Sequence, residues 1–363
     1  MSKKTVFITG GGTGGHIYPA VAIYDELLKY ISCEDIFYVG NKKNLEKRIA
    51  SQKGMNFLSV NVGGMPRKLT FKFVSWFLKL LVAFFVSVFY ILKYRPRFIV
   101  GTGGYVAFPI LAAGVMLQVP CYIHDSDAYP GIVSRVLAPY VRCVFLAFDE
   151  AKTRIKAKKV IINGNPLRDF SCGVSKEDAL KKLELSQEKK TLFVMGGSQG
   201  AKTINKAILE VAEKLTKEHN LQIIHQCGAK NFDETKSLVP EGLESYILRP
   251  YFDDMSIPYA ACDFVVARAG SISLSELNNC GLPAILIPYP HAAANHQFFN
   301  AKAMEKQGAA VVLEDKDCTG EALLAVILGL LKDEEKFISM AENSKKLAKP
   351  NATKNLVEIL LAE

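Results

Sequence analysis

Short apolar runs alternate with stretches of helical periodicity along the whole chain. Strands that alternate with helices build βαβ units and hence parallel sheets. The stretch "NGNPLRDF" (163–170), with its Asn, Gly and Pro, interrupts this alternation and predicts a linker. The predicted strands are Val6–Ile8, Ile36–Val39, Phe57–Val60, Phe98–Val100, Cys121–Ile123, Cys143–Leu146 and Val160–Ile162 before the linker, and Thr191–Met195, Gln222–His225, Tyr246–Leu248, Phe264–Val266, Ala284–Ile287 and Ala310–Leu313 after it.

The two halves begin alike, each with a strand, a glycine-rich loop and a helix, in "FITGGGTGGH" and "LFVMGGSQGAKT". The pattern therefore predicts an α/β protein of two Rossmann-like domains, residues 1–165 and 166–363, facing each other across a cleft. The last helix could pack back on the first domain. Because ligands of open parallel sheets bind beyond the carboxyl ends of the strands, both glycine loops should point into the cleft.

Residues 71–94, "FKFVSWFLKLLVAFFVSVFYILKY", form the most apolar segment. As a helix it would be roughly 36 Å long. It could span a membrane, form a buried core helix, or lie partly exposed in a membrane interface. A span would split the strand–helix alternation that continues on both sides. The interfacial interpretation is favoured by the basic residues around the segment: Arg67, Lys68, Lys72, Lys79, Lys93, Arg95 and Arg97.

The charge of the chain is uneven. Residues 1–165 hold 22 Lys and Arg against 9 Asp and Glu, a net charge of +13, whereas residues 166–363 hold 23 against 27, a net charge of −4. A basic half indicates nucleic acid or an anionic membrane surface, unless the lysine richness is incidental. Next to the apolar segment it favours the membrane, and we expect no nucleic-acid partner.

Composition and cysteine usage are those of a two-domain protein from a reducing compartment. The chain has 363 residues, 49% of them hydrophobic, which is long for one domain. The eight cysteines are scattered without a C-x-x-C pair, as expected of free thiols. The apolar run at the start, "TVFITG", is too short for a secretory signal, so we expect a cytoplasmic protein.

The first loop, "TGGGTGGH", formally matches the dinucleotide fingerprint G-x-G-x-x-G. That site needs an acidic residue at the end of the second strand, but here the strand ends in "FYVGNKK". The loop "GGSQGAKT" misses the P-loop pattern because Ala201 separates Gly200 from Lys202. Dinucleotide redox chemistry and ATP hydrolysis are therefore disfavoured, although both loops suit phosphate oxygens.

Three further clusters each follow a strand and precede a helix: "GTGGYVAFP" (101–109), "RAGSISLSEL" (268–277) and "PYPHAAANHQFFNA" (288–301). In the second, Ser271 or Ser273 could cap the helix. Glu276 could accept hydrogen bonds from ribose hydroxyls or serve as a capping carboxylate. In the third, Asn295, His296 and Gln297 are uncharged groups suited to sugar hydroxyls.

These loops, in this order, together with "GNPLR" and "YFDDM", resemble the MurG family of peptidoglycan N-acetylglucosaminyltransferases over nearly the whole chain. The resemblance implies the two-domain GT-B glycosyltransferase fold, with the acceptor and the membrane on the N-terminal domain and the UDP-sugar on the C-terminal one. It implies transfer of N-acetylglucosamine, with inversion, from UDP-N-acetylglucosamine to the C4 hydroxyl of a lipid-linked muramyl-pentapeptide. The alternative is a transferase of the same fold that uses another lipid or hydrophobic acceptor.

Site residues follow from the resemblance, motif by motif. It implies that Arg168 and Ser198 contact UDP, that Phe252 offers backbone groups to uracil, that Glu276 binds the ribose and that Gln297 binds the sugar. Where many relatives have "HEQN", this chain has "HDSD", which puts Asp127 near the donor sugar. The implied donor set is Thr13, Gly14, Gly15, Asp127, Arg168, Ser198, Gln199, Gly200, Phe252, Ser271, Ile272, Ser273, Leu274, Glu276 and Gln297; the implied acceptor set is Gly103, Gly104, Tyr105, His124 and Asp125.

Inverting transfer needs a base for the acceptor hydroxyl and stabilisation of the departing UDP. His16 is the first candidate for the base, because histidine titrates near neutrality; Asp125 and His124 are the alternatives. "FDDM" lacks the spaced D-x-D of metal-dependent glycosyltransferases, so we expect no metal and no cofactor. The implied location is peripheral, on the cytoplasmic face of the inner membrane, where other cell-wall synthesis proteins could be partners.

Overall fold

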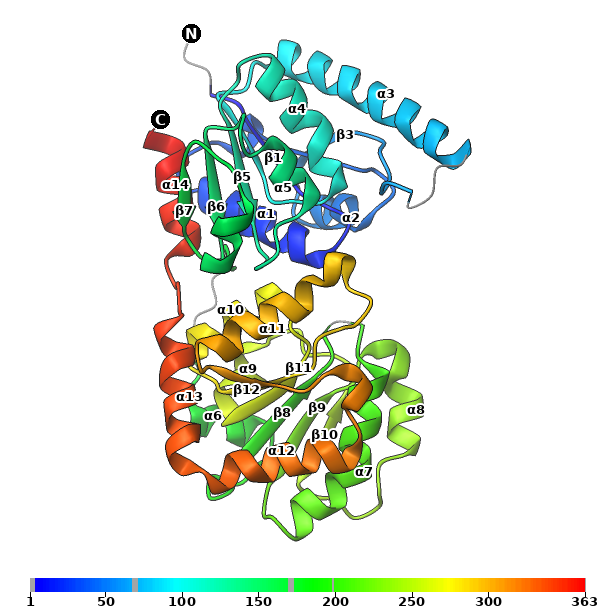
Figure 1. Cartoon of the computed structure of the whole chain (residues 1–363), viewed down its shortest axis with the longest axis vertical. Helices are drawn as coiled ribbons and strands as arrows, with labels where there is room; N and C mark the ends of the chain where they lie inside the picture. Colours follow the sequence, from blue (N-terminus) through cyan, green and yellow to red (C-terminus); the bar gives the residue numbers. More distant parts are fainter. Residues whose placement is uncertain (1–3, 67–70, 169–172, 198, 363) are drawn as a thin grey trace. The chain divides into compact units, whose positions relative to one another are not determined.

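The computed structural model describes residues 4–66, 71–168, 173–197 and 199–362. The chain divides into two compact units (Figure 1). Unit 1 comprises Met1–Asp169 and Pro350–Glu363, and unit 2 comprises Phe170–Lys349. Each unit contains one sheet in which all pairings are parallel, and each of the thirteen predicted strands is present. The expected class of two Rossmann-like α/β domains is confirmed.

Unit 1 has a seven-stranded sheet in the order β3-β2-β1-β4-β5-β6-β7. The order reverses between β1 and β4, which pair with Val6 opposite Phe98. The strands are β1 (Val6–Thr9), β2 (Ile36–Gly40), β3 (Asn56–Ser59), β4 (Phe98–Gly101), β5 (Cys121–Asp125), β6 (Cys143–Leu146) and β7 (Val160–Ile162), and the α-helices are α1 (Gly14–Leu27), α2 (Leu45–Gln52), α3 (Phe71–Tyr94), α4 (Phe108–Met116), α5 (Ile132–Leu137) and α14 (Ala352–Ala362).

The strands of unit 1 are apolar on both faces because helices cover both. Phe7 and Ile99 belong to the core that includes α3 and α4, whereas Val6 and Ile8 belong to the core that includes α1 and α14. This alternation is the two-residue period of a strand. The C-terminal helix α14 packs on α1, so residues from Pro350 onward belong to unit 1. This is the return of the last helix that was left open for the domain 166–363.

Unit 2 has a six-stranded sheet in the order β10-β9-β8-β11-β12-β13, which reverses between β8 and β11. Its main core combines the sheet with α7 and α12. The strands are β8 (Thr191–Met195), β9 (Gln222–Gln226), β10 (Tyr246–Arg249), β11 (Phe264–Ala267), β12 (Ala284–Leu286) and β13 (Ala310–Val312), and the α-helices are α6 (Lys176–Lys182), α7 (Lys202–Lys217), α8 (Phe232–Ser237), α9 (Ser256–Ala261), α10 (Ser271–Cys280), α11 (His296–Lys306), α12 (Gly320–Lys332) and α13 (Glu334–Lys346).

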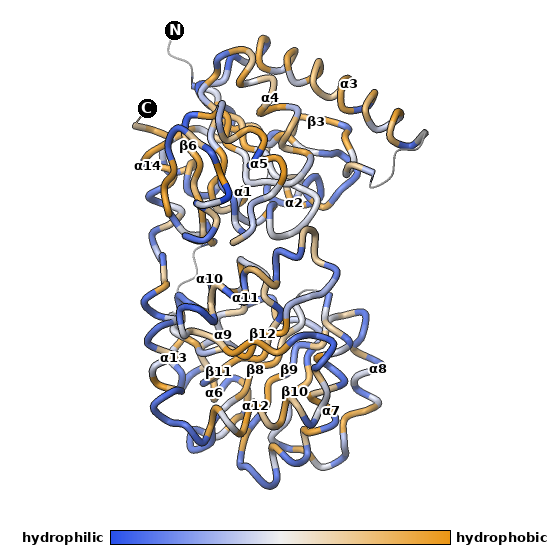
Figure 2. The backbone as a smooth tube through the Cα atoms, in the orientation of Figure 1, coloured by the Kyte–Doolittle hydropathy of each residue, from blue (hydrophilic) through white to orange (hydrophobic). Residues whose placement is uncertain are grey.

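Helix α3 is long and apolar enough to cross a membrane by length and composition, yet only 17% of its most apolar stretch is buried. Its inner positions Ala83, Ser87 and Ile91 recur every four residues and are buried. Its outer side chains are exposed, including Val82 at 63% and Phe85 at 67%. Figure 2 shows that hydrophobic residues predominate along the helix. The interpretation as a fully buried core helix is therefore wrong.

Candidate active site

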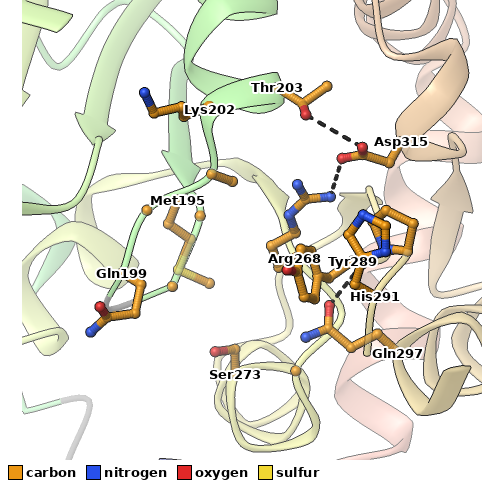
Figure 3. A pocket seen from close by; sticks show the side chains of 16 residues that line it. Met195, Gln199, Lys202, Thr203, Arg268, Ser273, Tyr289, His291, Gln297 and Asp315 are labelled. Carbon is orange, nitrogen blue, oxygen red and sulfur yellow. Dashed lines mark hydrogen bonds and ion pairs between the residues drawn. The ribbon is translucent and has the colours of Figure 1, made fainter. Parts of the chain in front are cut away.

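A cavity of about 650 Å³ lies in unit 2, at the carboxyl edge of the sheet and beside the reversal between β8 and β11 (Figure 3). Ligands of open parallel sheets bind at this kind of position. The lining residues come from the loops after four strands and from the starts of the helices that follow: Met195, Gly196, Gly197, Gln199, Gly200, Ala201, Lys202, Thr203, Arg268, Gly270, Ser273, Tyr289, Pro290, His291, Gln297 and Asp315.

Helices α7 and α10 begin at this cavity. Helix α7 starts after Ala201 and α10 starts after Gly270, and neither of these N-cap residues has a side chain that could cap its helix. The prediction that Ser271 or Ser273 caps α10 is therefore wrong, because Gly270 holds the N-cap position. The first N–H groups of a helix have no partner inside the helix, and the helix dipole makes this end positive. The cavity is thus suited to phosphate oxygens.

One cationic side chain is held inside the cavity. The Arg268 guanidinium forms an ion pair with Asp315 and lies 5.5 Å from the centre of the Tyr289 ring. The Tyr289 N–H donates to Gln297 Oε1 at 3.0 Å, which fixes the carboxamide of Gln297 at the cavity wall. The cavity therefore combines a cation, two helix starts and an amide group that can bind sugar hydroxyls.

The predicted donor residues divide into two groups. Gln199, Gly200, Ser273 and Gln297 line the cavity. Ser198 lies outside the described residues. The others do not line the cavity: Ile272, Leu274 and Glu276 on α10 and the buried Ser271 at its start, Phe252 after β10, and Thr13, Gly14, Gly15, Asp127 and Arg168, which belong to unit 1.

Two of these residues have internal partners. Glu276 Oε2 accepts a hydrogen bond of 3.0 Å from the hydroxyl of the buried Tyr259. The backbone N–H of Phe252 donates to Gln226 Oε1 at 2.9 Å. A uracil ring would therefore compete with Gln226 for that N–H. The carbonyl of Phe252 is the other backbone group that could bind such a ring.

In unit 1 the loops after β1 and β4 pack backbone against backbone, on either side of the point where the strand order reverses. Gly11 N donates to Gly103 O at 3.3 Å, and Thr102 Oγ1 donates to His16 O at 2.6 Å. Gly104 has φ +79°, and a Cβ there would lie 2.0 Å from Gly11 O. Only glycine permits this approach.

The structure brings His16 together with the predicted acceptor residues Gly103, Gly104 and Tyr105. A Cβ on Gly103 would lie 2.7 Å from His16 Nδ1, so the imidazole packs against this glycine. His16 Nδ1 is buried and has no hydrogen-bond partner among the described residues. The Tyr105 hydroxyl accepts from Asn44 Nδ2 at 3.2 Å, and the ring lies beside Gly12.

His124 and Asp125 end the neighbouring strand β5, and both are buried. Burial lowers the pKa of His124 to about 4, although the hydrogen bond with Gly164 O opposes this shift. Burial and the nearby Asp127 raise the pKa of Asp125. The Asp125 carboxylate accepts from the backbone N–H groups of Asp127 at 3.2 Å and Gly131 at 2.9 Å. Asp125 thus holds the loop that follows β5.

Thr13, Gly14, Gly15 and Arg168 also belong to unit 1. Thr13 is the N-cap of α1, and its carbonyl, not its side chain, takes part in hydrogen bonds there, from His16 N and Ile17 N. Gly14 and Gly15 are the first two residues of α1. The exposed Arg168 places its guanidinium 4.5 Å from the centre of the Tyr18 ring.

The sequence reasoning missed Arg268, Tyr289, His291 and Asp315 in the cavity and Glu46 beneath the first glycine loop. Arg268, Tyr289 and His291 lie within the loops "RAGSISLSEL" and "PYPHAAANHQFFNA", whose small and amide residues had been the candidates. Asp315 follows the last strand of unit 2, and the rule that ligands bind beyond strand ends could have found it. Glu46 is 1% exposed, and no sequence signal pointed to it.

Among residues 4–66, 71–168, 173–197 and 199–362, no group of three or more His, Cys, Asp or Glu side chains is arranged to hold a metal ion.

The two folds and the cavity are those of a glycosyltransferase of the GT-B class. The Glycosyltransferase family 28 N-terminal domain matches residues 6–146, and the C-terminal domain of the same family matches residues 191–356; the chain belongs to this family. It is 40% identical to the UDP-N-acetylglucosamine–N-acetylmuramyl-(pentapeptide) pyrophosphoryl-undecaprenol N-acetylglucosamine transferase of Halothermothrix orenii, over 98% of both chains. The predicted resemblance to the MurG family is confirmed.

Solved structures agree with this assignment. The crystal structure of Acinetobacter baumannii MurG matches with a TM-score of 0.82 and 26% identity, covering 99% of this chain and 100% of that one. The UDP-N-acetylglucosamine 2-epimerase of Neisseria meningitidis, bound to its nucleotide sugar, matches with a TM-score of 0.66 and 14% identity, over 99% of this chain and 100% of that one. This second likeness concerns the fold alone.

Proposed function

We propose that the chain transfers N-acetylglucosamine from UDP-N-acetylglucosamine to the C4 hydroxyl of undecaprenyl-diphospho-N-acetylmuramoyl-pentapeptide, with inversion of the anomeric carbon. This is the step from lipid I to lipid II in peptidoglycan synthesis. The observation that carries the proposal is the unit 2 cavity, where two helix starts and Arg268 offer positive charge to a diphosphate. The names of the full-length relatives supply the substrates.

In this proposal the donor binds in unit 2. Its diphosphate lies against the starts of α7 and α10, and its sugar hydroxyls reach Gln297. Glu276 accepts hydrogen bonds from the ribose, with Tyr259 holding one of its carboxylate oxygens. The uracil lies against the Phe252 backbone, with Gln199, Gly200, Ser271, Ile272, Ser273 and Leu274 shaping the site. In the same proposal Arg168, Asp127 and residues 13–15, which belong to unit 1, are donor-binding residues as well.

The acceptor binds at the paired loops of unit 1, against Gly103, Gly104 and Tyr105. His16 takes the proton of the C4 hydroxyl as the acceptor oxygen attacks the anomeric carbon, and the bond from that carbon to the UDP oxygen breaks. Since Nδ1 of His16 is buried, Nε2 is the nitrogen that receives the proton. His124 stays neutral at pH 7 because its pKa is about 4. Asp125 orders the loop that carries Asp127.

Helix starts and arginine stabilise the negative charge that accumulates on the departing UDP, and in this proposal no metal is required. Backbone donors already aimed at the position of the developing charge need no rearrangement during the reaction. Glycine loops have no side chains between their backbone N–H groups and the substrate. They can therefore stabilise the charge of the transition state directly.

We further propose that α3 docks unit 1 on the cytoplasmic face of the inner membrane, where other cell-wall synthesis proteins are candidate partners. The exposed apolar face of α3 supports this, together with the exposed Lys72, Lys79 and Lys93. Arg97 plays a different part from the one predicted, because its guanidinium donates to Leu361 O and ties down α14.

The test is an assay with labelled UDP-N-acetylglucosamine and the lipid-linked muramyl-pentapeptide. We expect a labelled disaccharide lipid, and we expect His16→Ala to lower kcat by about 10²-fold or more. Transfer to a different lipid with none to the muramyl lipid would contradict the proposed acceptor. Near-normal turnover of His16→Ala at saturating acceptor would contradict the proposed base only.

A further inference from the structure

An acidic side chain lies inside a cavity that is otherwise suited to anions. Asp315 opens the short turn after β13, and one of its oxygens forms an ion pair with Arg268 (Figure 3). Its other oxygen accepts a hydrogen bond of 3.3 Å from Thr203, in the first turn of α7. Both side chains of the ion pair are largely covered, with exposed fractions of 10% for Arg268 and 17% for Asp315.

Asp315 is not needed to aim the guanidinium. Arg268 Nη1 donates to the backbone carbonyls of Ile287 at 3.1 Å and Pro288 at 3.3 Å, and the group lies over the Tyr289 ring. These contacts come from the loop after β12 and fix the side chain independently of the acid. What Asp315 alone supplies is a negative charge beside the cation.

The positive charge of the cavity affects the binding of the substrate and of the product differently. The diphosphate of a nucleotide sugar carries two negative charges. After the sugar leaves, the terminal phosphate is a monoester whose second pKa is near 6, so the nucleoside diphosphate carries close to three charges at pH 7.5. Because Coulomb attraction grows with charge, a fully cationic cavity would hold the product more tightly than the substrate.

We infer that Asp315 acts electrostatically through Arg268: it lowers the positive charge of the cavity and so favours the nucleotide sugar over the nucleoside diphosphate that must leave. The inference rests on the proposed binding of the donor in this cavity. The other cationic side chain of the wall, Lys202, forms an ion pair with Glu234 on an exposed surface. Arg268 is therefore the cation whose charge Asp315 controls.

The experiment compares Asp315→Asn with Asp317→Asn in the full chain. Asp317 lies in the same turn, is exposed and does not line the cavity, so its substitution removes the same formal charge without touching Arg268. The measurements are the inhibition constant of UDP, the KM for UDP-N-acetylglucosamine and kcat, each at low and at high salt.

For Asp315→Asn we expect the inhibition constant of UDP to fall by about fivefold and the donor KM by about twofold. We expect kcat to fall as product release slows, and the effects to shrink at high salt. Asp317→Asn should stay within about twofold of the wild type. A rise of both constants for Asp315→Asn would overturn the inference, because it would show that the acid only keeps the cavity in shape; an equal effect of Asp317→Asn would overturn it too.

Loss of the ion pair can lower the melting temperature, since breaking a covered ion pair is destabilising. If Asp315→Asn does not fold, Asp315→Ser removes the same charge while keeping a hydroxyl next to Thr203. The inhibition constant of UDP and the donor KM of that variant then test the inference. An absence of UDP inhibition in the wild-type chain would instead contradict the proposed donor site itself.

Discussion

Gly200 shows how closely the backbone of unit 2 is packed behind its cavity. The residue has φ +73°, and a Cβ there would lie 1.9 Å from the carbonyl oxygen of Cys227, in the loop after β9. Asn231 Nδ2 also donates to that carbonyl, at 3.1 Å, and to Gln199 O at 3.2 Å. These contacts hold the glycine loop on the side away from the cavity. A side chain at position 200 would therefore push the loop into the cavity.

Gly200→Ala should therefore cost both stability and nucleotide affinity. Gly242→Ala is the matched control, because Gly242 has φ +72° with open space around it. Left-handed strain alone costs about 1–2 kcal/mol and applies to both. We expect Gly200→Ala to lose at least about 2 kcal/mol more in denaturant unfolding, and to weaken UDP binding by tenfold or more in calorimetry. Equal losses in the two variants would show that the contact with Cys227 is not limiting.

The buried His124 should make the stability of unit 1 depend on pH. Its pKa is about 4 in the folded protein against 6.5 in an unfolded chain. Between these values the unfolded state binds more protons, so the free energy of unfolding falls as the pH falls from 6.5 to 4. The contribution amounts to about 3 kcal/mol. His225 in unit 2, with a pKa of about 3, adds a similar dependence there.

His124→Gln keeps a donor for Gly164 O but cannot titrate. We expect its unfolding free energy to change less than that of the wild type over this pH range, by about 3 kcal/mol. Denaturant titrations at pH 4, 5, 6 and 7 measure the difference. Parallel curves for the two proteins would mean that His124 is not buried as a neutral imidazole.

At the scale of single residues, the sequence motifs predicted which loops form the candidate site, but they did not predict all of the side chains in it. Gln199 and Gly200 were assigned to the donor through the resemblance to the MurG family, and Gln297 also because an uncharged amide group suits sugar hydroxyls. Asp315 and Arg268 were missed because their role depends on the ion pair between them. An ion pair between loops 47 residues apart in sequence leaves no local sequence signal.

Among the elements, α3 is the one that the sequence left undecided. A helix that is apolar all round has no polar face to mark the solvent side, so its hydrophobic pattern alone fits a core helix, a span or an interfacial helix. Only the basic residues around the segment favoured the interfacial interpretation. The structure supplies the missing information: the stripe at Ala83, Ser87 and Ile91 packs on unit 1, while Phe85 and Phe89 are 67% and 58% exposed. An exposed apolar face of this kind indicates an interaction surface.

Substitution of Phe85 and Phe89 by Ser should weaken binding to anionic vesicles. Burial of a Phe side chain contributes roughly 1.5–3 kcal/mol, so the double variant should bind at least tenfold less. Co-sedimentation with vesicles that contain phosphatidylglycerol measures this, and high salt should weaken the wild type further. Leu238→Ser, at an exposed apolar residue of unit 2, is the control and should bind as the wild type does. Equal binding of all three proteins would contradict docking through α3.

For the whole molecule, the alternation of strands and helices was enough to predict two parallel sheets and to place the ends of every strand to within two residues. It was not enough to assign the last helix. Helix α14 is amphipathic like its neighbours, and only its contacts with α1 place Leu356 and Leu360 in the core of unit 1. A chain segment that returns to an earlier domain depends on tertiary packing, which periodicity cannot report.

The division of labour between the two units can be tested by hydrogen exchange. UDP should slow exchange in unit 2, at residues 196–197, 199–203, 268–273 and 289–297, because these segments contribute residues to the cavity wall and their helix starts would donate to phosphate. The lipid-linked acceptor, in detergent, should slow exchange at residues 10–16 and 101–106 of unit 1, where the loops after β1 and β4 meet. The control is uridine, which lacks the diphosphate and should leave the start of α7 unprotected. Protection by UDP confined to the loops of unit 1 would reverse the proposed assignment of donor and acceptor.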